Sequence, residues 1–226
     1  VDKDSMLFQA IKPKGGEMPV VMGAGGSGIL LHEAIGHAFE ADFNRKNTSI
    51  FSDQLNKKVC NEHINVVDDG TIPFNRGSVN IDDEGVDGQK TYIVREGVLT
   101  SYLHDRISAK HYGIPSTGNG RRESFRQTPI PRMRATYMEA GNVTEEEIIS
   151  TVKKGIYAAN FTIGQVQIGA GDFTFFVKDG YLIENGKLTQ PIKDINIIGN
   201  GPKALADITM VGNNYKMDNG TWTCGK

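Results

Sequence analysis

The most chemically suggestive segment is residues 32–37, His-Glu-Ala-Ile-Gly-His, in which two histidines flank one glutamate. A neutral imidazole is a good zinc ligand, and a carboxylate beside a metal-bound water can accept that water's proton. The familiar pattern for this chemistry, H-E-x-x-H, has one residue fewer between its histidines. The segment therefore predicts a zinc site of altered spacing.

The extra residue has a geometric consequence. On a regular α-helix, two residues five apart lie about 140° apart around the axis, so His32 and His37 could not both reach one ion. A π-helical turn, with its i→i+5 hydrogen bonds, would return them to one face. Gly36 is a weak point where such a turn could form, since glycine is conformationally permissive. A zinc site here therefore predicts a local break in helical regularity.

A catalytic zinc usually has three protein ligands and one open position, so a third ligand is needed. Spacing alone does not identify it. The alternative interpretation is that His32 and His37 are unrelated, one in the core and one on the surface. The candidates for the third ligand are Glu40, Asp42, Cys60, His63, His104, His111 and Cys224.

A competing motif lies directly upstream. Gly23, Gly25 and Gly28 fit G-x-G-x-x-G between an expected strand and an expected helix, and Asp53 follows at a distance that a dinucleotide site could use. The chain beyond Asp53 shows hairpins rather than the alternating strands and helices of a doubly wound sheet. We therefore favour close packing of these glycines over dinucleotide binding.

Five arginines gather in residues 115–134, a stretch that reads as a long loop of the kind that is often functional. Guanidinium groups bind carboxylates bidentately, so the loop could hold a peptide carboxylate, with Arg121 and Arg122 as the substrate-binding candidates. A basic surface loop or an RNA-contacting arm is the alternative. Only Phe125 is interleaved as an aromatic, which makes nucleic acid the weaker of these. The five arginines are Arg121, Arg122, Arg126, Arg132 and Arg134.

Composition sets broad limits. The 226 residues are 38% hydrophobic and 23% charged with a net charge of −2, which indicates neither a nucleic-acid binder nor a membrane-surface protein. The apolar runs are too short for a transmembrane span. Two cysteines, Cys60 and Cys224, are too few for a disulfide framework and fit a cytoplasmic location. The chain begins at Val1 without a signal-peptide pattern, so we expect a fragment or a processed product.

The pattern of turns and alternating residues predicts an α+β fold, predominantly antiparallel sheet, barrel-like or curved, with a few helices, one of which carries the His-Glu-x-x-x-His motif. The expected elements are a strand at 19–22, a helix at about 29–42, a hairpin at 91–99 with its turn at 95–97, a helix at 105–112 closed by Gly113, a helix from 142 to about 159, a meander over 161–198 with turns at 178–180 and 184–187, and a helix at 202–210.

Taken together, these motifs resemble the TldD/PmbA family of metallopeptidases. The resemblance covers nearly the whole chain in register. It is similar to the TldD side, because the PmbA (TldE) side lacks the His-Glu-x-x-x-His pattern. The segments that carry it are residues 28–37, 40–45, 81–85, 116–124, 129–133 and the final Cys224-Gly225-Lys226.

The resemblance implies a set of roles. The family's zinc ligands fall on His32, His37 and Cys224, and its catalytic glutamate falls on Glu33. The implied activity is zinc-dependent hydrolysis of peptide bonds in unfolded peptides or small proteins, with Glu33 activating a zinc-bound water. Such peptides are expected to lie extended against a strand, which reads backbone more than side chains.

The resemblance also implies an assembly. We expect a homodimer, or a heterodimer with a PmbA/TldE-like subunit, and neither a nucleic-acid nor a membrane partner. Residues 1–226 are expected to form one C-terminal metallopeptidase domain, without the N-terminal domain and extreme C-terminus of the family. The alternative is a non-catalytic peptide-binding or assembly module of such a complex, without functional zinc.

Overall fold

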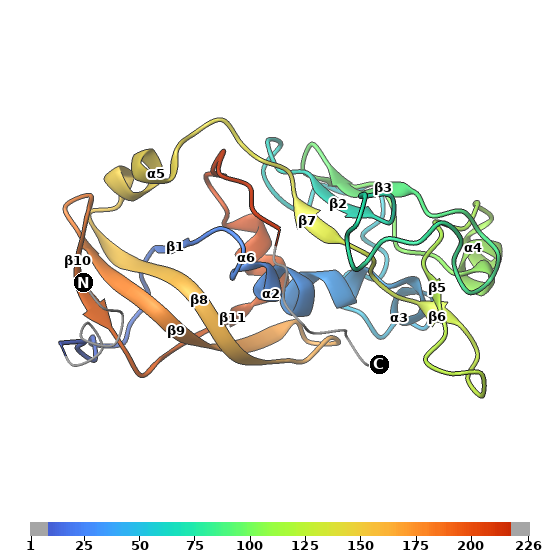
Figure 1. The fold of residues 1–226 in the computed structure, drawn as a ribbon, viewed down its shortest axis with the longest axis horizontal. Helices are drawn as coiled ribbons and strands as arrows, with labels where there is room; N and C mark the ends of the chain where they lie inside the picture. The colour runs from blue at the N-terminus through green and yellow to red at the C-terminus, as the bar shows by residue number, and fades with distance from the viewer. Residues whose placement is uncertain (1–8, 218–226) are drawn as a thin grey trace.

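The computed structural model describes residues 9–217 and shows two main β-sheets with a helical segment between them (Figure 1). The larger sheet contains β1 (Val20–Met22), β8 (Lys154–Val166), β9 (Asp172–Glu184), β10 (Lys187–Ile192) and β11 (Ile195–Asn200). The second contains β2 (Val66–Asp69), β3 (Lys90–Arg95), β4 (Val98–Leu99) and β7 (Thr136–Met138). A small two-stranded sheet pairs β5 (Gly120–Arg121) with β6 (Ile130–Pro131).

Short helices complete the architecture. The central segment comprises α2 (Gly28–Leu30), η1 (Leu31–Gly36), η2 (His37–Phe39) and α3 (Ala41–Arg45). The others are α4 (Arg106–Tyr112), α5 (Glu145–Thr151) and α6 (Gly201–Ala206). None of the helices between residues 9 and 217 has both the length and the apolar character that crossing a membrane requires.

The sheets are mostly antiparallel, as the sequence predicts. In the larger sheet the order is β1-β8-β9-β10 with β11 also on β9, and only β1 and β8 run parallel. In Figure 1, β8 and β9 form a long curved ribbon. The described strands do not close on themselves, so the barrel-like form of the prediction is wrong and the curved, open form is the one found.

The hydrophobic core lies around the central helical segment. Ile35 and Phe39 from this segment are fully or almost fully buried, in the same core cluster as Ile93 of β3 and Phe175 of β9. η1 itself packs against β7, β8 and α6. Burial of such side chains contributes roughly 1.5–3 kcal/mol each. The segment that carries the His-Glu-x-x-x-His motif is therefore anchored by both sheets.

Several predicted boundaries are confirmed by local chemistry. The hairpin turn between β3 and β4 has Glu96 and Gly97 at positive φ. α4 begins at Asp105, whose side chain accepts from the Ser108 N–H, and ends at Gly113 in the left-handed conformation. α5 begins at a capping box, in which Thr144 and Glu147 satisfy each other's backbone N–H groups.

Other boundaries were predicted wrongly. α5 ends at Thr151 rather than near Ala159, because residues from Lys154 onward pair with β9 and their backbone groups go to the sheet. Residues 178–180 form no turn, since Gly180 lies within β9 between Ala158 and Ile192 on the neighbouring strands. α6 ends at Ala206, short of the predicted residue 210.

The glycine-rich turn after β1 is a packing device. A Cβ atom at Gly23 would overlap the Tyr157 hydroxyl and press on the backbone of Ala159 in β8. Gly23 therefore allows the turn to approach the sheet closely. This confirms the packing interpretation, and the mostly antiparallel sheet does not provide the doubly wound architecture that the dinucleotide alternative requires.

Candidate metal centre

The histidine motif lies on a widened turn. Residues 31–36 are π-helical and residues 37–39 continue as a 3₁₀ turn. The His37 N–H donates to the carbonyl of His32, an i→i+5 bond that joins the two histidines directly. The local irregularity predicted from the extra residue is therefore present, and the motif does not lie on a regular α-helix.

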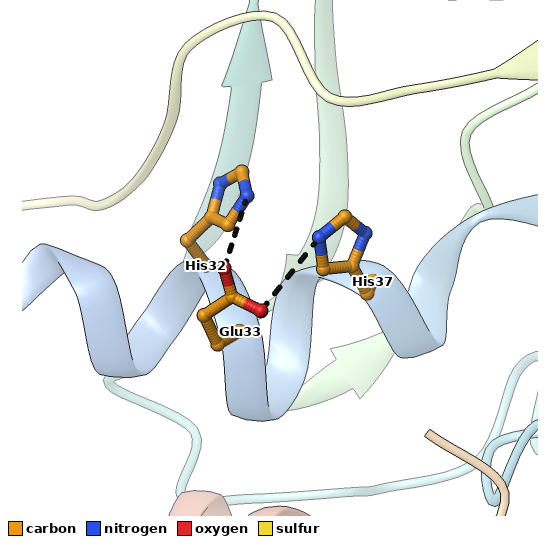
Figure 2. Close-up of side chains that lie close together, drawn as sticks. All are labelled: His32, Glu33 and His37. Atoms are coloured by element: carbon orange, nitrogen blue, oxygen red, sulfur yellow. Dashed lines mark ion pairs between the residues drawn. The ribbon is translucent and has the colours of Figure 1, made fainter. Parts of the chain in front are cut away.

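This turn brings three potential ligand groups to one face. Figure 2 shows Glu33 between the imidazoles of His32 and His37. Glu33 Oε1 lies 4.0 Å from Nε2 of His32, and Oε2 lies 3.9 Å from Nε2 of His37. The two rings meet edge to face at a centroid distance of 4.8 Å. One ligand atom from each residue lies within 4.8 Å of the other two.

The three side chains differ in exposure. The side chains of His32 and Glu33 are 31% and 35% exposed, whereas that of His37 is 10% exposed. The cluster therefore opens to solvent on the His32 and Glu33 side. A bound molecule would approach from that side, whereas the opposite side of His37 faces the protein interior.

Glu40 holds His37. Its Oε2 lies 3.0 Å from His37 Nδ1, and its side chain is fully buried. Because a carboxylate can only accept, the proton belongs on Nδ1 and Nε2 carries the lone pair that faces Glu33. Burial raises the pKa of Glu40, while the hydrogen bond from His37 and the charge of Arg132 oppose that shift. A carboxylate partner of this kind is typical of metal-binding histidines.

Six of the seven candidates for a third ligand lie within the described residues, and none joins the three-residue cluster. Glu40 is hydrogen-bonded to His37 Nδ1, so it is better placed to orient the imidazole than to act as a metal ligand beside it. Asp42 lies near Arg132. Cys60 is a buried core thiol, and burial raises its pKa to about 11. The seventh, Cys224, lies outside the described residues, so its ligand role remains a prediction.

The remaining histidines lie elsewhere. His104 is buried beside the rings of Tyr102 and Tyr112, and burial lowers its pKa to about 4. His111 is exposed on α4, and His63 is exposed in the loop before β2.

The arginines of residues 115–134 make different contacts. Arg122 donates from its side chain to the carbonyl of Gln127 in its own loop, and Arg121 lies on β5 opposite Ile130. Substrate contact by Arg121 or Arg122 therefore remains a prediction. The arginine that reaches the motif is Arg132, whose Nη1 lies 3.2 Å from Glu40 Oε2. Sequence reasoning did not separate it from its neighbours. No signal in the sequence distinguishes it from Arg134, which is also flanked by apolar residues.

Gly36 allows this arginine-bearing segment to approach the motif. A Cβ at Gly36 would collide with the sulfur of Met133, which is buried against the π-helical turn. Gly36 therefore favours the close packing of Met133 against this turn.

The donor set fits a divalent metal ion of the zinc type. Two imidazole nitrogens and one carboxylate converge, one imidazole is held in the required tautomer by a buried carboxylate, and the face is partly open. The cluster is therefore buried on the His37 side and accessible to solvent on the His32 and Glu33 side.

The comparisons agree with this chemistry. Residues 15–225 match the family model described as the PmbA/TldA metallopeptidase C-terminal domain. The chain is 51% identical over 211 residues to a protein of Buchnera aphidicola named metalloprotease TldD homolog, covering 93% of this chain and 44% of that protein. It is 36% identical over 209 residues to the zinc metalloprotease TldD homolog of Saccharolobus solfataricus, covering 92% and 46%. The chain thus spans about half the length of these relatives.

Two solved structures share the fold. One is a Thermotoga maritima protein described as a candidate modulator of a DNA gyrase, with a TM-score of 0.84 and 26% identity over 92% of this chain and 47% of that one. The other is TldE from Thermococcus kodakarensis, with a TM-score of 0.80 and 24% identity over 92% and 48%. The second likeness is one of fold alone.

Proposed function

The chain belongs to the TldD/PmbA metallopeptidase family, and from that premise we propose that it is a zinc-dependent peptidase acting on unfolded peptides. The observation that carries the proposal is the convergence of His32, Glu33 and His37 on one partly open face. The name of the Saccharolobus solfataricus relative supports zinc as the metal.

His32 and His37 would bind the metal through Nε2, and Cys224 would supply the third ligand by its match to the family motif. The hydrogen bond from His37 Nδ1 to Glu40 supports this tautomer. When bound, zinc would polarise the scissile carbonyl and lower the pKa of a water molecule.

Glu33 would act as the general base and then the general acid. Its carboxylate lies between the two imidazoles and is 35% exposed, so it can meet both a water molecule and a substrate. It would accept one proton from the attacking water and return it to the amide nitrogen as the peptide bond breaks. The products are a carboxylic acid and an amine; the acid then gives its proton to the amine, leaving a carboxylate and an ammonium group, and Glu33 ends ionised as it began.

The open edge of β8 could bind an extended peptide. β1 pairs with β8 only from Ile156 to Ala158, and β8 continues to Val166 with no further strand on that edge among residues 9–217. β8 also packs against η1. Pairing of a peptide with this edge would present backbone groups to the cluster and tolerate many side chains. Arg121 and Arg122 remain the proposed contacts to substrate carboxylates.

Zinc content and peptide cleavage, measured on the same samples, test the proposal. Glu33→Ala should retain zinc and lose about 10²–10⁴-fold in cleavage rate, because it removes the general base but neither histidine ligand. His37→Ala should lose both zinc and cleavage. The exposed Glu62 gives the matched control, since Glu62→Ala should change neither.

Two results would contradict the proposal. Cleavage by Glu33→Ala at the wild-type rate would exclude the role of Glu33. Zinc-free wild-type protein that binds peptides without cleaving them would instead favour the non-catalytic peptide-binding module.

We also propose that the protein works as a homodimer or with a PmbA/TldE-like subunit. The support is the family itself and the fold shared with TldE. Light scattering of the protein alone and mixed with such a subunit would separate the two forms.

A further inference from the structure

We propose that Arg132 is a positioning residue of the metal centre, which fixes the Glu40 carboxylate so that it orients His37. The inference rests on the proposed zinc site. It assigns a role to a residue 95 positions beyond His37 in the sequence, on a different element of the fold.

A continuous line of contacts joins the two residues. Glu40 Oε2 lies 3.0 Å from His37 Nδ1 and 3.2 Å from Arg132 Nη1. All three side chains are buried or nearly so, at 10% exposure for His37, 0% for Glu40 and 8% for Arg132. One carboxylate oxygen therefore receives both donors, and a movement of the guanidinium would move the acceptor of the imidazole.

Arg132 is itself held in place. Its backbone N–H donates to the carbonyl of Asn119 at 2.9 Å, and its Nη1 donates to the carbonyl of Pro131 at 2.7 Å. The guanidinium carbon lies 5.7 Å from the ring centroid of Phe43, within the range of a cation–π contact. Because the side chain is fixed by backbone and ring contacts, it can serve as a rigid support for Glu40.

The chemistry of the pocket favours arginine over another cation. Arg132 Nη1 lies 3.2 Å from Glu40 and 3.7 Å from Asp42 Oδ1, so one guanidinium lies beside two buried carboxylates. A planar, permanently charged fork can meet several acceptors in fixed directions, whereas a lysine ammonium is a compact point charge on a flexible stem. The direction of the Glu40 carboxylate therefore depends on where the guanidinium holds Nη1.

A neighbouring arginine provides the contrast. Arg134 donates to the carbonyls of Gly118 and Gly120 at 3.2 and 2.9 Å. These contacts hold Gly118 and the start of β5 and do not include Glu40. Arg134→Met is therefore a matched control for removing a partly buried arginine from the same segment.

The test is the zinc affinity of the whole chain, measured by competition with a chromogenic chelator. Arg132→Met should weaken zinc binding by about 10-fold or more, the range seen when partners of metal ligands are removed. Arg134→Met should bind zinc as wild type does. Circular dichroism checks that each variant is folded, and Arg132→Lys, which keeps the charge and loses the fork, carries the test if Arg132→Met does not fold.

A spectroscopic readout separates positioning from general loosening. With Co²⁺ in place of zinc, Arg132→Met or Arg132→Lys should change the visible absorption spectrum, since His37 is no longer held at its wild-type angle, while Arg134→Met should leave the spectrum unchanged.

The possible failures are distinguishable. Unchanged affinity and spectrum in the folded Arg132 variants, or equal changes in the Arg134 variant, would overturn the positioning role and leave the zinc site intact. A wild-type chain that binds no zinc would overturn the proposed function and this inference with it.

Discussion

Two buried carboxylates, Glu40 and Asp68, differ in how their oxygens are used. Asp68 accepts from Asn119 Nδ2 on one oxygen and from the Arg134 N–H and Thr136 hydroxyl on the other, at 2.7–2.8 Å. Glu40 receives His37 and Arg132 on Oε2, and its Oε1 has no hydrogen-bond partner among the described residues. Burial raises the pKa of both.

The difference separates structure from positioning. Asp68 is satisfied on both oxygens by neutral donors from β7, the segment before it and the loop before β5, which is the arrangement of a structural clamp. Glu40 is bonded on one oxygen to a histidine of the open cluster and to a cation. We infer that Asp68 maintains the fold and that Glu40 serves the proposed metal centre.

The largest expected effect is on the clamp. Asp68→Ala removes the acceptor of three buried or partly buried hydrogen bonds, and we expect the free energy of unfolding to fall by about 3–5 kcal/mol. Urea denaturation measures this. A loss below about 1 kcal/mol would mean that Asp68 is not a structural clamp.

The reciprocal change is at Glu40. Glu40→Gln replaces a charged acceptor of His37 by a neutral amide, and zinc affinity should fall by about 10–100-fold. Chelator competition measures it. Asp68→Asn makes the same substitution at the other buried carboxylate and should leave the zinc affinity of the folded protein unchanged. Equal losses in both variants would remove the distinction between the two carboxylates.

The buried base His104 should make stability depend on pH in the opposite sense to the two buried carboxylates. Burial lowers its pKa to about 4, against an ordinary value near 6.5, and its Nδ1 has no hydrogen-bond partner among the described residues. Between these values the unfolded chain binds a proton that the folded one excludes, so stability falls as pH falls through this window.

The contribution of His104 should be a loss of about 2 kcal/mol between pH 7 and pH 5. Glu40 and Asp68 have raised pKa values and act in the opposite direction. Urea denaturation of His104→Phe isolates the histidine, because both carboxylates remain. If the variant and wild type lose equal stability over this range, His104 does not titrate as described.

The smallest effect is expected at Gly36. Gly36→Ala places a methyl group against the sulfur of Met133, and thermal denaturation should show a loss of about 1 kcal/mol, since methionine can adjust. Gly15→Ala is the neutral control, because Gly15 has no heavy atom near its missing Cβ and no positive φ. Gly85 also has space for a Cβ, but its positive φ makes it unsuitable. A stabilised Gly36→Ala protein would contradict the packing account.

The sequence predicted features that depend on local chemistry. The extra residue between His32 and His37 predicted the widened turn, because the angular argument involves only the helix itself. Asp105 and Gly113 likewise predicted both ends of α4. These features are decided within a few residues along the chain.

Features decided by distant contacts were missed. Residues 152–159 continue a helical pattern but belong to β8 from Lys154, because pairing with β9 provides their hydrogen bonds. Arg132 could not be distinguished from Arg134, since only the folded chain brings one to Glu40 and turns the other to backbone carbonyls. The third zinc ligand likewise rests on the family motif rather than on local spacing.

X-ray absorption at the zinc edge tests the central claim most directly, because it reports the ligands of the bound ion. We expect two imidazole nitrogens at about 2.0–2.1 Å and, with Cys224 as third ligand, one sulfur at about 2.3 Å. The imidazole signal should be lost in the variant with both His32→Ala and His37→Ala. Zinc bound without imidazole ligands, or an unchanged spectrum in that variant, would contradict the account.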